Sequence, residues 1–311
     1  MKRLLAILFV LFMTAGSGGC IKVNILEEVQ PLTEQTISGS GRDKVLVLDI
    51  TGIIVSGDIS SPLSERKKPG LIARMREALD RARRDRDVKA VVLRINSPGG
   101  GVTASDTLYH ELMKFKQETG VVMVAHIMDV GASGGYYAAL AADTITAQPT
   151  SVTGSIGVIM YRVDATGLLQ KIGVQASEIS SGDRKSMGSP FRPLSDDERK
   201  IFQDVIDSLY VRFTALVAES RKLDPEAVRK LADGRIFTSQ EAKAAGLIDG
   251  IGYIEDAVQL AKKKAGLTRA SVVMYLRPGE YRNNLYSLNL FNVDLGELAE
   301  PGARFFYLWW P

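Results

Sequence analysis

The 311-residue sequence contains one cysteine and two histidines, and this scarcity excludes several classes of protein. A single cysteine has no partner within the chain, so a disulfide-stabilised scaffold is excluded. A structural zinc site, which needs about four Cys or His ligands, is nearly excluded by the same counts. The 39 basic and 36 acidic residues leave a net charge of only +3, so we expect no nucleic-acid partner.

Long apolar runs are also scarce, and the most prominent one lies at the amino terminus. Two basic residues precede ten apolar residues at 4–13, which are too few for a transmembrane helix but typical of a secretory signal. Small residues then lead to Cys20, at the position where bacterial lipoproteins carry a lipidated cysteine, although Ser17 replaces the usual leucine. We expect a lipoprotein-type signal peptide at 1–19 and a lipid anchor on Cys20. An ordinary signal peptide with a coincidental cysteine is the alternative.

Apolar periodicity in the remaining sequence predicts an α/β fold. Buried strands are predicted at 45–50, 88–95, 121–128 and 144–147, and helices at 71–84, 103–116, 136–142, 196–220, 224–231, 239–245 and 253–265. Strands and helices that alternate at this spacing predict a mainly parallel sheet with crossover helices. We expect a tether at 20–42, one domain at 43–265 and a C-terminal tail at 266–311.

Two glycine-rich turns follow two of these buried strands. Ser97–Gly101 contains three consecutive glycines, and Ser133 is followed by Gly134 and Gly135 at the start of a helix. Ligands of parallel sheets bind at the carboxyl ends of the strands, so both turns should lie at one edge of the sheet. An exposed serine hydroxyl beside backbone N–H groups from both turns could carry out nucleophilic catalysis, with the N–H groups stabilising an oxyanion.

A serine nucleophile needs a base, and neither histidine is well placed. His110 lies in a helical segment that we expect at the surface. His126 lies inside a buried strand, seven residues and about 20 Å along an extended chain from Ser133. A neutral lysine can serve instead, as in Ser–Lys variants of the catalytic triad, but composition does not indicate which lysine.

Four motifs in this order resemble the signal peptide peptidase A family in its short bacterial form, over about residues 43–265. This family belongs to the fold superfamily of the Clp protease subunit and the crotonases. The motifs are Arg94–Gly100, Ala132–Tyr137, Thr153–Val158, and Ser181–Ser186 with Ser189–Pro190 after it.

The resemblance implies a Ser–Lys peptidase that needs no metal or organic cofactor. Ser133 would be the nucleophile, Lys185 the general base, and Ser155 the residue whose hydroxyl holds the lysine amine. The N–H groups of Gly100 and Gly134 would form the oxyanion hole.

The same resemblance implies the substrate and the setting. The substrate would be the peptide remnants of cleaved signal peptides. The enzyme would be a homo-oligomer on the extracytoplasmic side of a bacterial cell membrane, with the base supplied by the same or a neighbouring protomer. Two alternatives are a crotonase-like acyl-CoA enzyme and a non-catalytic lipoprotein scaffold.

Two surface features have no assigned role in this scheme. Arg81, Arg83, Arg84 and Arg86 form a basic cluster, which is either a solvated helix face or a contact for anionic lipid headgroups. The aromatic C-terminus, with Trp309 and Trp310, is either a packing strap in a groove or an interfacial membrane contact.

Overall fold

The computed structural model describes residues 30–57, 59–61, 64–278, 280, 282–287 and 304–309. The expected signal peptide and Cys20 lie outside these ranges. Within them, no helix combines the length and the apolar character needed to cross a bilayer.

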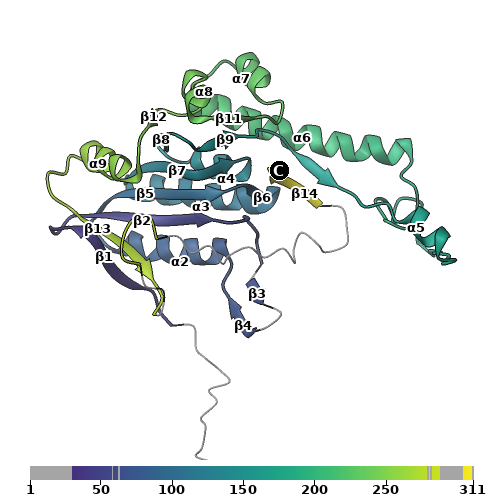
Figure 1. Cartoon of the computed structure of the whole chain (residues 1–311), viewed down its shortest axis with the longest axis horizontal. Coiled ribbons are helices and arrows are strands. Elements are labelled where there is room, and N and C mark those ends of the chain that lie inside the picture. Colours follow the sequence, from purple (N-terminus) through teal and green to yellow (C-terminus); the bar gives the residue numbers. More distant parts are fainter. Residues whose placement is uncertain are drawn as a thin grey trace, which may run out of the picture. The chain divides into compact units, whose positions relative to one another are not determined.

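The largest sheet has the strand order β1-β13-β2-β5-β7-β8-β12, with β9 pairing to the end of β7 and β11 pairing to β9. The strands from β13 to β12 run parallel to one another, whereas β1 and β11 are antiparallel to their neighbours. The prediction of a mainly parallel α/β sheet is therefore confirmed (Figure 1). Its strands are β1 (Thr33–Gly39), β2 (Lys44–Thr51), β5 (Val88–Ser97), β7 (Val122–Ala132), β8 (Thr144–Ala147), β9 (Val152–Gly154), β11 (Ile236–Thr238), β12 (Gly250–Ile251) and β13 (Ser271–Leu276).

Two smaller sheets accompany the main one. The strands β6 (Gly99–Gly101), β10 (Ile159–Tyr161) and β14 (Arg304–Leu308) form an antiparallel sheet in the order β10-β14-β6. The strands β3 (Ile59–Ser61) and β4 (Ser64–Lys68) form a hairpin.

Helices cover both faces of the main sheet, and the alternation of side chains along each strand separates the two cores. On β2, Leu46 and Leu48 pack in the core that includes residues of α2 and α3, whereas Val45 and Val47 pack in the core that includes residues of α9. The helices are α2 (Leu71–Arg84), α3 (Val102–Thr119), α4 (Gly134–Ala139), α5 (Thr166–Lys171), α6 (Asp196–Arg221), α7 (Pro225–Leu231), α8 (Ser239–Ala244) and α9 (Ile254–Lys264).

The domain boundaries expected at residues 43 and 265 were too narrow. Part of the expected tether forms β1, the edge strand of the main sheet, and part of the expected tail forms β13, which lies between β1 and β2. The pairing joins Thr33 to Leu276, more than 200 positions apart in the chain, and no local sequence pattern indicates such a distant partner. The domain therefore includes these two segments.

A buried arginine holds the segment after β13 against the sheet. Arg94 on β5 is fully buried, and its guanidinium binds both carboxylate oxygens of Asp49, at 2.6 and 2.9 Å. The same group donates to the backbone carbonyls of Leu285 and Ser287. Because every partner is fixed in the fold, Arg94 stabilises the position of residues 282–287.

We expect the Arg94→Met variant to lose about 3 kcal/mol of unfolding free energy, because it removes the two-pronged donor to the mostly buried Asp49 carboxylate, which keeps only Arg282, and leaves the Leu285 carbonyl without its donor. Chemical denaturation measures this loss. Arg84→Met is the matched control, since it makes the same replacement at an exposed arginine. We expect it to change the unfolding free energy by no more than about 0.5 kcal/mol. Equal stability of the two variants would contradict the structural role of Arg94.

Candidate functional site

Ser133 occupies a strained turn between β7 and α4. Its φ is +51°, which is uncommon for a residue other than glycine, and its side chain is 1% exposed. Among the described residues, the other non-glycine positions with positive φ are Ser155 and Lys222. Lys222 ends α6, where a left-handed residue is ordinary. The strain at the two serines is instead typical of functional sites.

The structure brings these two strained serines together. The end of β7 pairs with β9, so that Ala132 lies opposite Gly154, and the Ser133 N–H donates to the Gly154 carbonyl at 2.7 Å. Ser155 follows directly and is itself buried, with its N–H bound to the Arg235 carbonyl at 2.8 Å. Ser155 therefore lies beside Ser133 along the paired backbone, and its expected role of holding the lysine amine stays a prediction.

The two glycine-rich turns also meet, and they do so more closely than other residues would permit. A Cβ on Gly99, whose φ is +105°, would lie 2.7 Å from the Gly134 nitrogen. A Cβ on Gly100 would overlap the Ile54 carbonyl, because the neighbouring Gly101 N–H donates a hydrogen bond to that carbonyl and holds β6 against it. The backbone amides of both turns therefore surround one small region next to Ser133.

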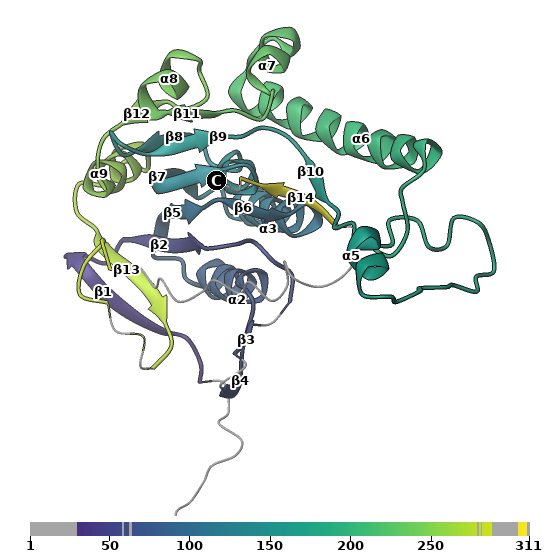
Figure 2. The same ribbon diagram turned by 45° about the vertical axis from the view of Figure 1, so that its right-hand side comes forward.

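Lys185 is not part of this cluster within one chain. Its side chain is exposed, and it lies in the segment between α5 and α6. Figures 1 and 2 both draw α5 and this segment out beyond the sheet, whereas α4 lies against it. The backbone N–H of Lys185 donates a hydrogen bond to the Gly182 carbonyl within the same segment. A dyad of Ser133 with Lys185 is therefore not assembled within the described chain.

His126 is a core residue, as expected, and not a base for Ser133. It is fully buried, and its Nδ1 lies 2.9 Å from the Thr146 hydroxyl. Burial lowers the pKa of His126 to about 4, while Asp256 acts weakly in the opposite direction. The ring therefore remains neutral in the folded protein at neutral pH.

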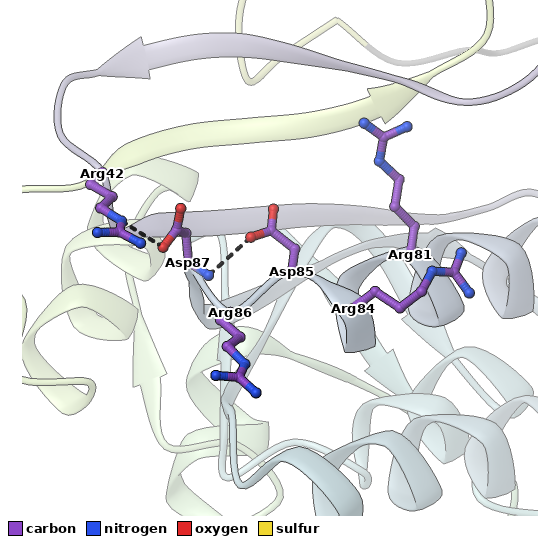
Figure 3. A pocket seen from close by; sticks show the side chains of 6 residues that line it. All are labelled: Arg42, Arg81, Arg84, Asp85, Arg86 and Asp87. Atoms are coloured by element: carbon purple, nitrogen blue, oxygen red, sulfur yellow. Dashed lines mark hydrogen bonds and ion pairs between the residues drawn. The ribbon is translucent and has the colours of Figure 1, made fainter.

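No group of three or more His, Cys, Asp or Glu residues in the described part of the chain could hold a metal ion. Three arginines of the basic cluster, but not Arg83, line a shallow pocket of about 440 Å³, whose lining residues are Arg42, Arg81, Arg84, Arg86, Asp85 and Asp87 (Figure 3). It lies just before β5, at the amino end of the strands, whereas the glycine-rich turns follow their carboxyl ends. The pocket is thus separate from the Ser133 region.

Sequence comparisons now identify the family. The model of peptidase family S49 matches residues 115–268, a range that includes Ser133, Ser155 and Lys185. The chain is 37% identical over 245 residues to a protein of Enterococcus faecium whose name describes it as a signal peptide peptidase SppA. That alignment covers 78% of this chain and 70% of the relative.

The chain belongs to peptidase family S49.

Other S49 relatives carry protease names as well. Serine protease SPPA of Arabidopsis thaliana chloroplasts is 36% identical over 230 residues, which are 73% of this chain and 33% of that protein. Among solved structures, a ClpP1 variant from Listeria monocytogenes is similar with a TM-score of 0.45 and 19% identity. That similarity covers 68% of this chain and 94% of the other. Family S49 and its named members make this chain a serine protease rather than an acyl-CoA enzyme.

Sequence reasoning missed three contributors to the Ser133 region: Gly99, the Ile54 backbone and the C-terminal strand β14. Gly99 was present in the recognised motif, but its positive φ is a property of the folded turn. Ile54 lies in no recognisable motif and outside the named strands, and it forms an isolated bridge to Gly100 of β6. The aromatic composition of residues 305–310 was the available signal for β14, and it indicated packing without indicating where.

We expect Gly100→Ala to lower kcat for peptide hydrolysis by about 10²–10³-fold, because the added Cβ displaces an amide beside Ser133. Gly101→Ala is the control, since a Cβ there would first meet the Ala104 Cβ at an ordinary 3.7 Å. Steady-state kinetics of both variants, with thermal unfolding to verify folding, test this. Similar kcat values in two folded variants would be inconsistent with a role for the Gly100 amide.

A second prediction concerns His126 and pH. Its pKa is about 4 in the folded state and 6.5 for an ordinary histidine, so its stabilising contribution is complete above pH 6.5 and is lost as the pH falls toward 4. Over that interval wild-type protein should lose about 3 kcal/mol more unfolding free energy than His126→Gln. His110→Gln, a change at an exposed histidine, should keep the wild-type dependence. Denaturation curves at several pH values give the unfolding free energy as a function of pH. The same pH dependence in all three proteins would refute the prediction.

Proposed function

We propose that this serine protease is a membrane-attached signal peptide peptidase that uses Ser133 as nucleophile and Lys185 as general base. The observation that carries the proposal is the strained, buried Ser133 beside the backbone amides of two glycine-rich turns. The names of its S49 relatives support the substrate class, the remnants of cleaved signal peptides.

The reaction proceeds through an acyl-enzyme. The neutral Lys185 amine accepts the Ser133 proton as the Ser133 oxygen attacks the scissile carbonyl, and the Gly100 and Gly134 amides stabilise the oxyanion. The resulting ammonium protonates the leaving amine, and water then hydrolyses the ester by the same route. The Ser155 hydroxyl holds the lysine amine in position.

The position of Lys185 favours a base supplied by a neighbouring copy. A lysine amine accepts a proton only in its neutral form, which burial favours, so the proposed role as general base requires Lys185 to be buried in the active enzyme. In one chain it is exposed, and the segment between α5 and α6 that carries it extends beyond the sheet (Figure 2). Docking its segment against a second copy would both bury the amine and bring it to Ser133.

The surface of the same segment supports such an assembly. Most of the exposed large apolar side chains in the described residues lie in β10 or between it and α6, and exposed apolar surface of this kind marks protein–protein contacts. They are Ile159, Tyr161, Val163, Leu168, Ile172, Val174, Ile179 and Phe191. A homo-oligomer in which this segment meets the neighbouring copy accounts for both observations.

The proposed location is the extracytoplasmic face of a bacterial membrane, with the chain anchored by a lipid on Cys20. The apolar run at 4–13 and the small residues before Cys20 support this placement. An anchor confines the enzyme to the surface where signal peptide remnants are found. No cofactor is required by the proposed chemistry.

A mixing experiment tests the shared dyad. We expect Ser133→Ala and Lys185→Ala each to abolish hydrolysis of a signal-peptide mimic. If neighbouring copies complete the site, co-assembly of equal amounts should restore about one quarter of wild-type activity, since Ser133 of one variant then meets Lys185 of the other.

The control is Lys171→Ala, which removes another exposed lysine, at the end of α5 just before this segment, and should leave activity close to wild type. Full activity of either dyad variant alone would eliminate the Ser–Lys assignment. Inactive single variants that stay inactive after co-assembly would limit the dyad to one chain.

A further inference from the structure

Lys185 lies in a run of tight turns at residues 181–188, here the Lys185 turn, and not in a helix or strand. Figure 2 shows the segment that contains it extending from α5 beyond the sheet before the chain enters α6. The backbone bonds of the turn are local, since the Lys185 N–H donates to the Gly182 carbonyl at 3.0 Å. Such bonds set the shape of a turn, so its orientation must come from contacts with other parts of the chain.

The Arg192 guanidinium joins the Lys185 turn to the start of α6. Its Nε donates to the Ser186 hydroxyl at 3.1 Å, so it contacts the residue directly after Lys185. Its two terminal nitrogens donate to the two carboxylate oxygens of Glu198, one of them at 3.1 Å. Glu198 is buried in the first turn of α6, where its carboxylate also accepts the Ser195 N–H. Arg192 therefore connects the Lys185 turn to a helix end that is fixed by its own capping box.

The Ser186 hydroxyl takes part in this contact as both acceptor and donor. It accepts from Arg192 and donates to the Glu178 carboxylate, and that carboxylate lies 3.4 Å from the Arg192 Nε. A planar guanidinium can bind Glu198 through one edge while its Nε binds Ser186, whereas a lysine ammonium lacks this fork. The contact thus depends on an arginine and fixes the side chain next to Lys185.

The backbone around Arg192 is itself held from the β10 side. Arg162, which directly follows β10, donates to the Ser189 carbonyl at 2.9 Å and also to the Arg192 carbonyl. The Ala165 N–H donates to the Pro190 carbonyl at 2.8 Å. Arg192 therefore starts from a fixed backbone position, and its side chain can define where the Lys185 turn lies.

We propose that Arg192 is a positioning residue for the general base, because it holds the Lys185 turn in the orientation that delivers the amine to Ser133. This inference rests on the proposed function. A general base must lie within hydrogen-bond distance of the hydroxyl that it deprotonates, and a misplacement of about 1 Å can lower the rate about 100-fold. Arg192 contacts neither substrate nor Ser133 in this role, and its loss acts through Lys185 alone.

Steady-state kinetics provide the first test. We expect Arg192→Gln to lower kcat for hydrolysis of a signal-peptide mimic by about 10–100-fold and to leave KM within about twofold of wild type, because Arg192 places the base and does not bind substrate. Arg199→Gln is the matched control, since it makes the same replacement at an exposed arginine near the start of α6, and it should keep wild-type kinetics.

Co-assembly then shows which half of the site Arg192 serves. When Ser133→Ala/Arg192→Gln is mixed with Lys185→Ala, every complete dyad has the altered Arg192 on the chain that supplies Lys185. We expect activity at least about tenfold below that of the pair without the Arg192 change. When Ser133→Ala is mixed with Lys185→Ala/Arg192→Gln, the altered Arg192 lies on the chain that supplies Ser133, and activity should equal that of the parent pair. Equal activity of the two mixtures would overturn the inference, since a general defect in folding affects both.

Ser186→Ala covers the case in which Arg192→Gln unfolds the chain. It removes the bond to the residue beside Lys185 and leaves Arg192 paired with Glu198, so we expect unchanged thermal unfolding and a kcat lowered by about threefold or more. Wild-type kcat in folded Arg192→Gln and Ser186→Ala, with Ser133→Ala and Lys185→Ala inactive, would overturn the inference and leave the proposed function standing. Full activity of Ser133→Ala or Lys185→Ala would overturn both.

Discussion

Close approach of backbone segments at three glycines is the constraint on which the Ser133 region depends. Gly99, Gly100 and Gly134 allow the turn after β5 to contact the turn after β7 and the Ile54 carbonyl at distances that a Cβ would prevent. The bond from the Ser133 N–H to the Gly154 carbonyl then fixes Ser133 at a positive φ. The cost of that strained conformation is offset by the parallel strands and the buried core around it.

Helix α6 connects the two parts of the proposed enzyme that are far apart in space. Its first turn is joined to the segment that carries Lys185, because Arg192 binds Glu198 and holds the pKa of that carboxylate at about 2. In its middle, the Phe213 ring packs against the Tyr307 ring of β14, and the Leu209 carbonyl accepts a hydrogen bond from the Tyr307 hydroxyl. One helix therefore contacts the segment that carries Lys185 at its start and the Tyr307 ring further along.

Elements with a local signal were predictable. The helix at 71–84 was predicted within its observed bounds because its apolar spacing is strict, and the start of α6 was predicted because Ser195 and Glu198 form a capping box within four residues. The helix expected at 103–116 extends to Thr119, since Gly120 in a left-handed conformation ends it. The strands β1, β13 and β14 were not predicted, because their pairing partners lie far away in the chain.

The sequence by itself determined the parallel α/β architecture, the placement of Ser133 after a buried strand and the order of motifs typical of family S49. These properties depend on periodicity, capping and turn chemistry within short windows. Only the tertiary structure decided that Ser133 and Ser155 are neighbours, that the segment carrying Lys185 extends beyond the sheet, and that Tyr307 lies opposite Gly100. Such proximities arise from the packing of segments separated by tens to hundreds of residues, and no local pattern encodes them.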